Sequence, residues 1–292
     1  EHVGARPVLV DVEPDTLNLQ PDAVAAAVTP ATKAIIAVHY AGHPVELNSL
    51  RAIADEFRLE LIEDAAHAVG ARFEGTPIGA GTNFTAFSFY ATKNLTTGEG
   101  GMLTGSQDLL DRARVVSLHG MNREAWSRYA AGGKWAYDIV EPGFKYNMMD
   151  LQAALGIHQL RALTRNWERR GRIWARYLEA FADLPITLPA PVEPDTRHAF
   201  HLFTPLFEAS RCGLSRDQFL EAMTRARLGV GVHYLSVPEH PVYQQKFGWR
   251  PEDYPHAMAI GRQTASLPLS AKIRPEDEER IIGVVRSLLR RV

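Results

Sequence analysis

The segment between residues 63 and 102 gathers the residue types that covalent catalysis requires. It holds an acidic residue, Asp64, a histidine, His67, and a lysine, Lys93, which follows Ser88 and precedes a glycine-rich loop. Lysine is scarce in this chain, which has only Lys33, Lys93, Lys134, Lys145, Lys246 and Lys272. A neutral lysine amine is a nucleophile that forms Schiff bases with carbonyl compounds. The sequence therefore directs the search for an amine nucleophile to this segment.

The same residue types are those that a pyridoxal phosphate site requires. A lysine amine forms the covalent link to the cofactor, and its pKa must be lowered for reaction near neutral pH. A buried carboxylate such as that of Asp64 keeps the pyridine nitrogen protonated, because the protonated ring is the better electron acceptor. Small hydroxyl residues such as Ser88 and the backbone N–H groups of a glycine-rich loop hold the phosphate.

Spacing alone leaves other interpretations open for each of these residues. Asp64 fits a loop cap or an ion-pair partner equally well, and Lys93 fits a surface lysine. His67 taken alone fits a partly buried histidine with an ordinary hydrogen-bond partner, and Ser88 fits a strand residue without a ligand. Glycine-rich loops also form turns that bind nothing. The elements that carry these residues therefore decide whether they meet.

Short apolar runs alternate with helical spacing in the first half of the chain, which predicts a mostly parallel sheet with helices on both faces. Four runs predict strands: Pro7–Val12, Ala34–His39, Glu60–Glu63 and Thr85–Phe89. The apolar residues of Leu47–Phe57 recur at helical spacing and predict the crossover helix between the second and third strands. Ligands of such sheets bind at the carboxyl ends of the strands, which is where Asp64 falls and where Lys93 follows.

The second half of the chain begins with a long helical pattern from Asp150 to Leu184, with Asp150 as the expected N-cap. A proline-rich stretch then interrupts regular structure. The remaining sequence predicts a strand at Ala199–Phe207, a helix at Arg216–Arg227, a strand at Gly231–Tyr234 and a helix at Pro275–Arg290. We expect an α/β fold with a large domain over residues 1–165 and a smaller C-terminal α+β domain over residues 166–292.

The composition excludes several classes of function. The net charge is −2, so no basic surface points to nucleic acid or to an anionic membrane. The single cysteine, Cys212, excludes an intramolecular disulfide and fits a reducing cytoplasm. No apolar run is long enough to span a bilayer. Two histidine pairs have spacings that a metal could use: His39 with His43, and His198 with His201. Neither pair has acidic or cysteine partners beside it in the sequence, so we expect no metal.

Five separated motifs stand in order along the chain. They are VDVEPDTLNL (10–19), AIIAVHYAGHPVEL (34–47), LIEDAAHAVGA (61–71), AFSFYATKNLTTGEGGM (86–102) and EPGFKYNMMDLQAALGIHQL (141–160). Shorter segments follow them: HLF at 201–203, GVHY at 231–234 and SLPL at 266–269. Together they resemble the DegT/DnrJ/EryC1/StrS family of pyridoxal-phosphate aminotransferases over essentially the whole chain. The resemblance implies a fold-type-I pyridoxal-phosphate transferase that acts on a nucleotide-linked keto sugar.

The resemblance also implies a role for each residue of the first segment. Lys93 corresponds to the Schiff-base lysine, and Asp64 corresponds to the partner of the pyridine nitrogen. His67 corresponds to a contact of the ring hydroxyl of the cofactor, and Ser88 to a contact of its phosphate. A lysine at position 93 separates this chain from the sugar dehydratases of the family, in which a histidine replaces it.

Two further residues gain a role only through the resemblance. Asn147, in the KYN motif, corresponds to a residue that reaches the cofactor phosphate of the neighbouring subunit, which implies a homodimer with shared active sites. His233, in the GVHY motif, corresponds to a position facing the sugar nucleotide. A strand-end histidine without a ligand remains the alternative for His233.

The implied reaction transfers an amino group from an amino acid such as glutamate to the keto sugar. The segments ATKNLTTGEGG (91–101) and HGMNREAWSRY (119–129) resemble members that aminate carbon 4, such as 4-amino-4-deoxy-L-arabinose aminotransferases, which implies lipopolysaccharide or polysaccharide biosynthesis. Two alternatives stay open: a fold-type-I enzyme acting on another keto substrate, and a non-catalytic sensor or scaffold. The presence of both Lys93 and Asp64 argues against the second.

Members of the family carry elements ahead of the VDVEPDT motif. These include a helix N-terminus that holds the phosphate and an aromatic residue that stacks on the pyridine ring. Only a few residues precede the motif here, so we expect a chain that is incomplete at its N-terminus. Without those N–H donors and that helix dipole, we expect the chain by itself to bind the cofactor weakly.

Overall fold

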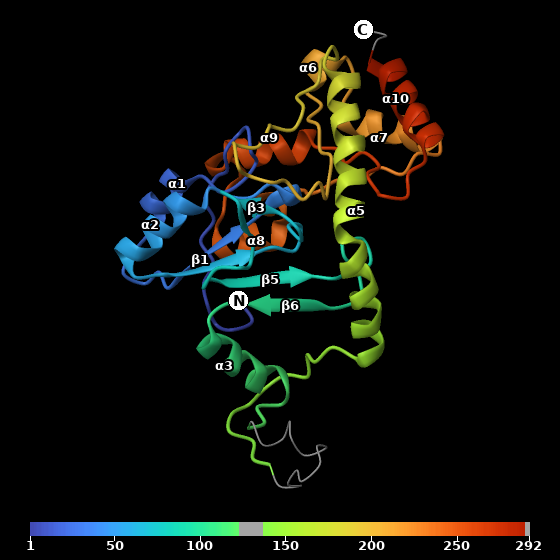
Figure 1. Ribbon diagram of the computed structural model, residues 1–292. Helices are drawn as coiled ribbons and strands as arrows, with labels where there is room; N and C mark the ends of the chain where they lie inside the picture. Colours follow the sequence, from blue (N-terminus) through green and yellow to red (C-terminus); the bar gives the residue numbers. More distant parts are fainter. Residues whose placement is uncertain (123–136, 290–292) are drawn as a thin grey trace.

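The computed structural model describes residues 1–122 and 137–289. At its centre is a four-stranded sheet with the strand order β1-β2-β5-β6 (Figure 1). The strands are β1 (Ala34–Val38), β2 (Glu60–Asp64), β5 (Phe84–Ser88) and β6 (Gly101–Thr104). β1, β2 and β5 are parallel, whereas β6 runs antiparallel to β5. The mostly parallel sheet confirms the predicted α/β fold, and β1, β2 and β5 lie within one residue of their predicted bounds.

Helix α2 (Leu47–Phe57) connects β1 to β2 with the predicted bounds. The side chain of Glu46 caps its N-terminus by accepting hydrogen bonds from the backbone N–H groups of Asn48 (3.3 Å) and Ser49 (2.6 Å). The buried apolar residues of α2 join those of β1 and β2 in one hydrophobic core. The crossover helix thereby holds the first two strands side by side.

Smaller elements surround the sheet. The N-terminal part contains α1 (Pro21–Ala27), the 3-10 turn η1 (Tyr40–Gly42), the hairpin strands β3 (Arg72–Phe73) and β4 (Thr76–Pro77), and α3 (Gln107–Ser117). The C-terminal part contains α6 (Ala209–Cys212), α7 (Arg216–Arg225), η2 (Val237–Glu239), α8 (Pro241–Phe247), η3 (Pro251–Asp253), α9 (Pro255–Gln263) and α10 (Pro275–Leu289). Helices α7 and α10 confirm the two helices predicted after the proline-rich stretch.

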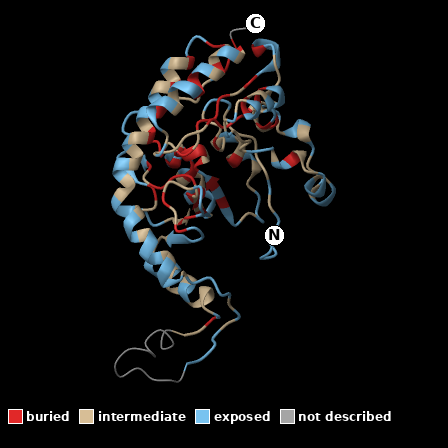
Figure 2. Cartoon of the chain, turned by 90° about the vertical axis from the view of Figure 1, so that its right-hand side faces the viewer, coloured by how far each residue is buried: buried red, intermediate tan, exposed pale blue. Residues whose placement is uncertain are grey.

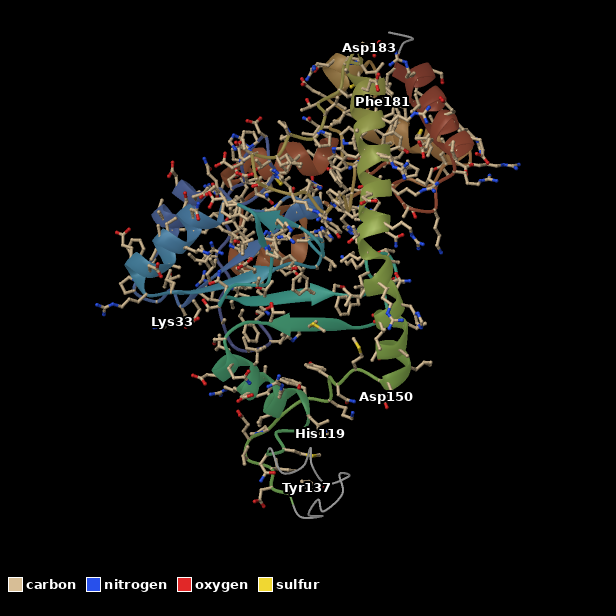
Figure 3. The ribbon with its side chains drawn as sticks, viewed as in Figure 1. Lys33, His119, Tyr137, Asp150, Phe181 and Asp183 are labelled. Atoms are coloured by element: carbon tan, nitrogen blue, oxygen red, sulfur yellow. The ribbon has the colours of Figure 1, made fainter. Side chains whose placement is uncertain are left out.

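The long helix α5 spans Asp150–Phe181 and runs along the side of the sheet toward which β5 points (Figure 1). Figure 3 marks Asp150 and Phe181 at its two ends. The predicted N-cap is wrong by one residue, because Met149 is the N-cap and its N–H donates to the side chain of Gln152 (3.0 Å). Asp150 lies instead in the first turn, where its negative charge suits the helix dipole.

The C-terminal half of α5 belongs to a second hydrophobic core. Its buried residues Ile173, Trp174, Tyr177 and Phe181 pack with Phe203 and with residues of α7 and α10. The rings of Tyr177 and Phe203 meet edge to face, with centroids 5.2 Å apart. The N-terminal half of α5 is mostly exposed, as the colours of Figure 2 show. The helix therefore joins the C-terminal core to the region beside the sheet.

Apolar side chains are exposed on the sheet and on the first half of α5. In β1, the buried residues Ile35 and Ala37 alternate with Ile36 and Val38, which are 60% and 40% exposed. In the first half of α5, four apolar residues are each more than half exposed: Leu151, Leu155, Ile157 and Leu160. Exposed apolar surface of this kind is typical of an interaction surface.

Three predicted strands are wrong. Residues 7–12, 199–207 and 231–234 form only isolated bridges, in which Val12 pairs with Leu19, Phe203 with Leu267, and Gly231 with Ser266. The β-branched and aromatic residues of these segments favour extended backbone, but a strand also needs a neighbour that continues the hydrogen-bond ladder. Pro205 further limits pairing in the second segment because it has no N–H to donate.

Gly42, at the end of η1, lets the segment around Ala199 approach the loop that follows β2. Its φ is +96°, in the left-handed region that favours glycine. A Cβ atom at this position would lie 2.9 Å from the Cβ of Ala199 and 2.9 Å from the carbonyl oxygen of His67. The Ala199 N–H donates to the Gly42 carbonyl (2.8 Å). This close approach therefore requires a residue without a side chain.

We expect Gly42→Ala to lower the free energy of unfolding by about 2–5 kcal/mol, the sum of left-handed strain and overpacking. Gly75→Ala is the matched control, because Gly75 also has a positive φ (+74°) but no atom within 4 Å of a Cβ placed there. The control should lose about 1–2 kcal/mol, the strain alone. Urea denaturation followed by circular dichroism measures both values, and equal losses would contradict the packing argument.

Candidate functional site

Two neighbouring strand ends bring Asp64 and Lys93 to the same edge of the sheet. Asp64 is the last residue of β2 and pairs in register with Ala86 of β5. After β5 ends at Ser88, the chain makes a turn in which the Lys93 N–H donates to the Tyr90 carbonyl (3.0 Å). Parallel strands end at the same edge of a sheet. The Asp64 carboxylate and the Lys93 amine are consequently close enough to interact electrostatically.

The Lys93 amine is half-buried, and burial lowers its pKa below the ordinary value for lysine. The Asp64 carboxylate acts in the opposite direction and raises this pKa, but burial has the larger effect. A larger fraction of the amine is therefore neutral near pH 7 than for a lysine in water. The neutral form is the nucleophile.

The loop after Lys93 folds back on the end of β5. The Phe89 carbonyl accepts a hydrogen bond from the Thr97 N–H (2.9 Å). Farther along the loop, the side chain of Gln152 on α5 donates to the Glu99 carbonyl (2.9 Å). These bonds hold the loop between the sheet and α5, so both elements fix the position of the lysine.

Asn94, directly after Lys93, ties the same loop to the C-terminal half of the chain. Its side-chain N–H donates to the Ala199 carbonyl (2.7 Å), and its side-chain oxygen lies 3.1 Å from Nδ1 of His201. The buried guanidinium of Arg170 on α5 donates to the His201 carbonyl (2.6 Å) and to the carbonyl before it. The segment around His201 thus bridges the lysine loop and α5.

His67 is buried in the loop after Asp64. Its ring centroid lies 4.4 Å from that of His201, and its Nε2 lies 3.2 Å from the hydroxyl of Tyr234. Burial, followed by the positive charge of Lys93, lowers the pKa of His67 to about 3. His67 is therefore neutral at pH 7, and its buried Nδ1 has no hydrogen-bond partner among the described residues.

His233 and Tyr234 reach this place from the C-terminal half of the chain. The hydroxyl of Tyr40 donates to the backbone carbonyl of His233. Burial, and to a smaller extent the positive charge of Lys93, lowers the pKa of His233. Burial, and to a smaller extent the negative charge of the Asp64 carboxylate, raises the pKa of the Tyr234 hydroxyl. His233 therefore lies within the electrostatic field of the lysine, and Tyr234 lies within that of the carboxylate.

Ser88 and Asn147 have surroundings different from those of the other predicted residues. The Ser88 hydroxyl is at the end of β5 and accepts a hydrogen bond from the Tyr90 N–H (3.3 Å). Asn147 is exposed in the segment ahead of α5, and its side-chain oxygen accepts a hydrogen bond from the Lys145 amine. In the part of the chain that the structure describes, no hydrogen bond joins Asn147 to Lys93. The hydrogen-bond partner that the structure gives for Asn147 is thus a neighbour in the sequence, not a residue of the lysine loop.

Comparison with known proteins decides the family. The family model of the DegT/DnrJ/EryC1/StrS aminotransferase family matches residues 1–286. The chain belongs to this family.

This family member is similar to proteins with sugar-related names. SpsC of Bacillus subtilis, a spore coat polysaccharide biosynthesis protein, is 43% identical over 291 residues, which cover 99% of this chain and 75% of SpsC. Spr1654 of Streptococcus pneumoniae in its PMP-form has a TM-score of 0.90 and 31% identity, covering 99% of this chain and 77% of that one. Helicobacter pylori PseC, an aminotransferase involved in pseudoaminic acid biosynthesis, has a TM-score of 0.90 and 25% identity, covering 100% of this chain and 76% of that one.

As a member of this family, the protein is a pyridoxal-phosphate-dependent aminotransferase with the fold-type-I architecture. Spr1654 has been solved in both a PLP-form and a PMP-form. The described residues fit this cofactor, because the Lys93 amine is half-buried beside the Asp64 carboxylate. In addition, the Nδ1 atom of His67 is a buried polar atom that has no hydrogen-bond partner within residues 1–122 and 137–289. Such an atom indicates a place where a ligand supplies the missing hydrogen bond.

Three residues of this aminotransferase site are not predicted from the sequence: Asn94, His201 and Tyr234. Asn94 and Tyr234 adjoin predicted residues, since they follow Lys93 and His233. Their partners, however, lie 107 and 167 residues away along the chain, and no local spacing predicts such contacts. The sequence analysis names His201 as half of a possible metal pair and as the first residue of the HLF motif, and assigns it no role at the site. The one indication in the sequence is that all three residues lie within the quoted motifs.

Other predictions concern metals, membranes and the subgroup of the family. Within residues 1–122 and 137–289, no group of three or more His, Cys, Asp or Glu side chains is arranged to hold a metal ion. In the same ranges, no helix has the length and apolar character needed to cross a membrane. Residues 123–136, which include most of the segment 119–129 used to predict the subgroup, lie outside the described residues.

We expect the stability of the protein to fall as the pH is lowered from about 6.5. The folded pKa of His67 is about 3, so below pH 6.5 the unfolded chain binds a proton that the folded chain does not, and stability is lost. His43, whose pKa burial lowers to about 4, acts in the same direction. Each histidine contributes a loss of at most about 1.4 kcal/mol per pH unit between its unfolded and folded pKa.

Urea denaturation between about pH 7.5 and 4.5 measures this slope. His67→Gln removes one of the titrating groups, so its slope should be smaller than that of the wild type. A wild-type slope in His67→Gln would contradict the burial of a neutral imidazole at this position.

Proposed function

We propose that this aminotransferase transfers an amino group from an amino acid, such as glutamate, to the carbon-4 keto group of a nucleotide-linked sugar. The observation that carries the proposal is the half-buried Lys93 amine beside Asp64 at the carboxyl edge of the sheet. Pyridoxal phosphate, when bound, supplies an aldehyde carbon and an electron-accepting ring. The residues of the chain bind this group and handle the protons.

Lys93 and Asp64 carry the two main chemical roles in this proposal. The Lys93 amine, kept partly neutral by burial, attaches the cofactor and, once released, moves a proton at the substrate carbon that bears the nitrogen. The Asp64 carboxylate faces the ring nitrogen and holds a proton there, which favours electron withdrawal. His67 contacts the ring oxygen, and Ser88 contacts the phosphate.

The proposed site also uses a second subunit. Asn147 reaches the cofactor phosphate of the neighbouring subunit in a homodimer. Its exposed position ahead of α5 supports a contact outside its own chain. The exposed apolar residues in the first half of α5, which begins shortly after Asn147, support a subunit interface in the same region. His233 lies toward the sugar nucleotide, and its interaction with Lys93 supports a position beside the reacting groups.

The names of similar proteins support a sugar as the substrate. SpsC is named for spore coat polysaccharide biosynthesis, and PseC for the biosynthesis of pseudoaminic acid. A sugar ketone is therefore a better candidate than a small keto acid, and the sequence of residues 91–101 supports carbon 4. A sensor or scaffold without activity would need neither the Lys93 amine nor the Asp64 carboxylate, so it remains the weaker alternative.

The same proposal includes the organisation and location of the chain. We propose a boundary near residue 165 between the large and small domains. Leu163 packs on the small apolar cluster of Val69, Phe89 and Leu95 beside the sheet, whereas Ile173 belongs to the C-terminal core, which supports this boundary. The single cysteine supports a cytoplasmic location.

Lys93→Ala and Lys93→Arg should each reduce transamination by about 10²–10⁴-fold or more, because neither side chain supplies a neutral amine. Borohydride reduction of the protein with bound pyridoxal phosphate should attach the cofactor permanently to the peptide that contains Lys93. Lys33→Arg is the matched control, since Lys33 is exposed at the side of the sheet away from α5 (Figure 3). Wild-type turnover in Lys93→Arg would contradict the role of this amine.

The second half-reaction, in which the aminated enzyme passes its amino group to a keto substrate, distinguishes the classes of substrate. Absorbance changes are recorded with a nucleotide-linked 4-keto sugar, a 3-keto sugar and a small keto acid. The fastest reaction should occur with the 4-keto sugar. Preference for the keto acid would support the alternative enzyme, and no reaction with any of them would favour the scaffold.

Mixing two inactive variants tests the shared site. If Asn147 acts in the neighbouring subunit, a dimer of one Lys93→Ala chain and one Asn147→Ala chain has one site with both residues intact. Random mixing should then restore about a quarter of the activity, because about half of the dimers are mixed and each has one intact site. Mixing Lys93→Ala with Asp64→Ala is the control and should restore nothing if both act in one chain. Absence of recovery with Asn147→Ala would contradict the shared site.

A further inference from the structure

Among the described residues, only one of the two ring nitrogens of His67 has a hydrogen-bond partner. Its Nε2 lies 3.2 Å from the Tyr234 hydroxyl, while its buried Nδ1 has no partner among the residues that the structure describes. The backbone before Tyr234 is held by two contacts of His233. Nδ1 of His233 lies 2.7 Å from the Ser266 hydroxyl, and its carbonyl accepts a hydrogen bond from Tyr40. The Tyr234 hydroxyl is therefore held in front of Nε2 of His67.

Elementary chemistry assigns the ring proton of His67 and the hydroxyl proton of Tyr234 to particular atoms. Burial and the charge of Lys93 keep His67 neutral, so its ring has one N–H donor and one acceptor nitrogen. Burial and the Asp64 carboxylate keep the Tyr234 hydroxyl protonated. A phenol donates a hydrogen bond more strongly than it accepts one, and an imidazole nitrogen with a free lone pair is a strong acceptor. Tyr234 therefore donates to Nε2, and the ring proton of His67 is on Nδ1.

A buried N–H without an acceptor is unfavourable unless a ligand provides one. The ring oxygen of pyridoxal phosphate is an acceptor with negative charge, which suits this donor. We propose that Tyr234 is a positioning residue that fixes His67 in the Nδ1–H form, so that His67 donates this N–H to the ring oxygen of the cofactor. This inference rests on the role proposed above for His67 and adds the residue that sets it.

In this proposal, Tyr234 affects cofactor binding through His67 and does not itself contact the reacting atoms. Without its hydroxyl, either nitrogen of His67 can carry the proton. A fraction of the molecules would then direct a lone pair, rather than an N–H, toward an oxygen with negative charge. The cofactor would bind those molecules less tightly. The loss would be specific to the ring oxygen and would not require any change in the fold.

The proton position on His67 can be measured in the protein without cofactor. In protein labelled with ¹⁵N-histidine, long-range ¹H–¹⁵N spectra distinguish Nδ1–H from Nε2–H, and the spectrum of His67→Gln identifies the signals. We expect Nδ1–H in the wild type and a mixture of both forms in Tyr234→Phe. Tyr243→Phe, on α8 and 37% exposed, is the matched control and should keep the wild-type signals. A wild-type His67 with its proton on Nε2 would overturn the proposal.

Cofactor affinity gives a second measurement. The dissociation constant of pyridoxal phosphate, measured by absorbance, should rise about three- to tenfold in Tyr234→Phe, as for the weakening of one hydrogen bond. The amide nitrogen of asparagine can occupy the place of Nδ1, whereas that of glutamine can occupy the place of Nε2. His67→Asn should therefore bind the cofactor more tightly than His67→Gln.

Circular dichroism verifies that each variant is folded before its affinity is compared. Equal affinity of the two His67 variants, or wild-type affinity in Tyr234→Phe, would overturn the proposal. Failure of the proposed function is distinguishable from failure of this inference. A wild-type protein that aminates no keto substrate would contradict the proposed function, whereas the proton position on His67 needs no substrate and still decides the role of Tyr234.

Discussion

The pairing of β2 with its two parallel neighbours is the constraint on which the rest of the structure depends. A buried chain of hydrogen bonds crosses these strands. The Val45 N–H donates to Nδ1 of His39 (3.1 Å), so the imidazole proton is on Nε2 and points at the Glu63 carboxylate (3.1 Å). Burial alone would raise the pKa of Glu63, but hydrogen bonds from His39 and Asn83 outweigh burial and lower it. Glu63 is thereby fixed on one face of β2, and the next residue, Asp64, faces the other way toward the lysine.

Burial gives the site its chemical character in two ways. It lowers the pKa of the Lys93 amine, which increases the fraction of the amine in its neutral, nucleophilic form. It also lowers the pKa values of His67, His201 and His233, which remain neutral and act as hydrogen-bonding groups rather than as charges. Because the histidines are uncharged, the Asp64 carboxylate interacts with the lysine without competition from cationic imidazoles. Burial is therefore the largest influence on the pKa values of the lysine and of the three histidines.

The elements that could be predicted are those whose pattern lies within a short stretch of sequence. The alternation of buried and exposed residues in β1 and the helical spacing of α2 are local, and both elements occur where they were expected. The segment 199–207 was expected to be a strand because its residues favour extended backbone, but its membership of a sheet depends on a partner elsewhere. Asp64 and Lys93 could be chosen from strand ends and motifs. The contacts of His67 with Tyr234 and of Asn94 with its distant partner depend instead on how the C-terminal half packs on the sheet.

Helix α5 connects these parts as one continuous element. Its 32 residues, with a rise of about 1.5 Å each, make it about 48 Å long. Gln152 near its start bonds to the Glu99 carbonyl of the lysine loop, Arg170 bonds to the carbonyl of His201, and Phe181 at its end is in the C-terminal core. Sharp bending of a helix disrupts its own hydrogen bonds, so these three contacts are joined through one continuous element. A displacement of the C-terminal core relative to the sheet edge would therefore be transmitted through α5 to the lysine loop.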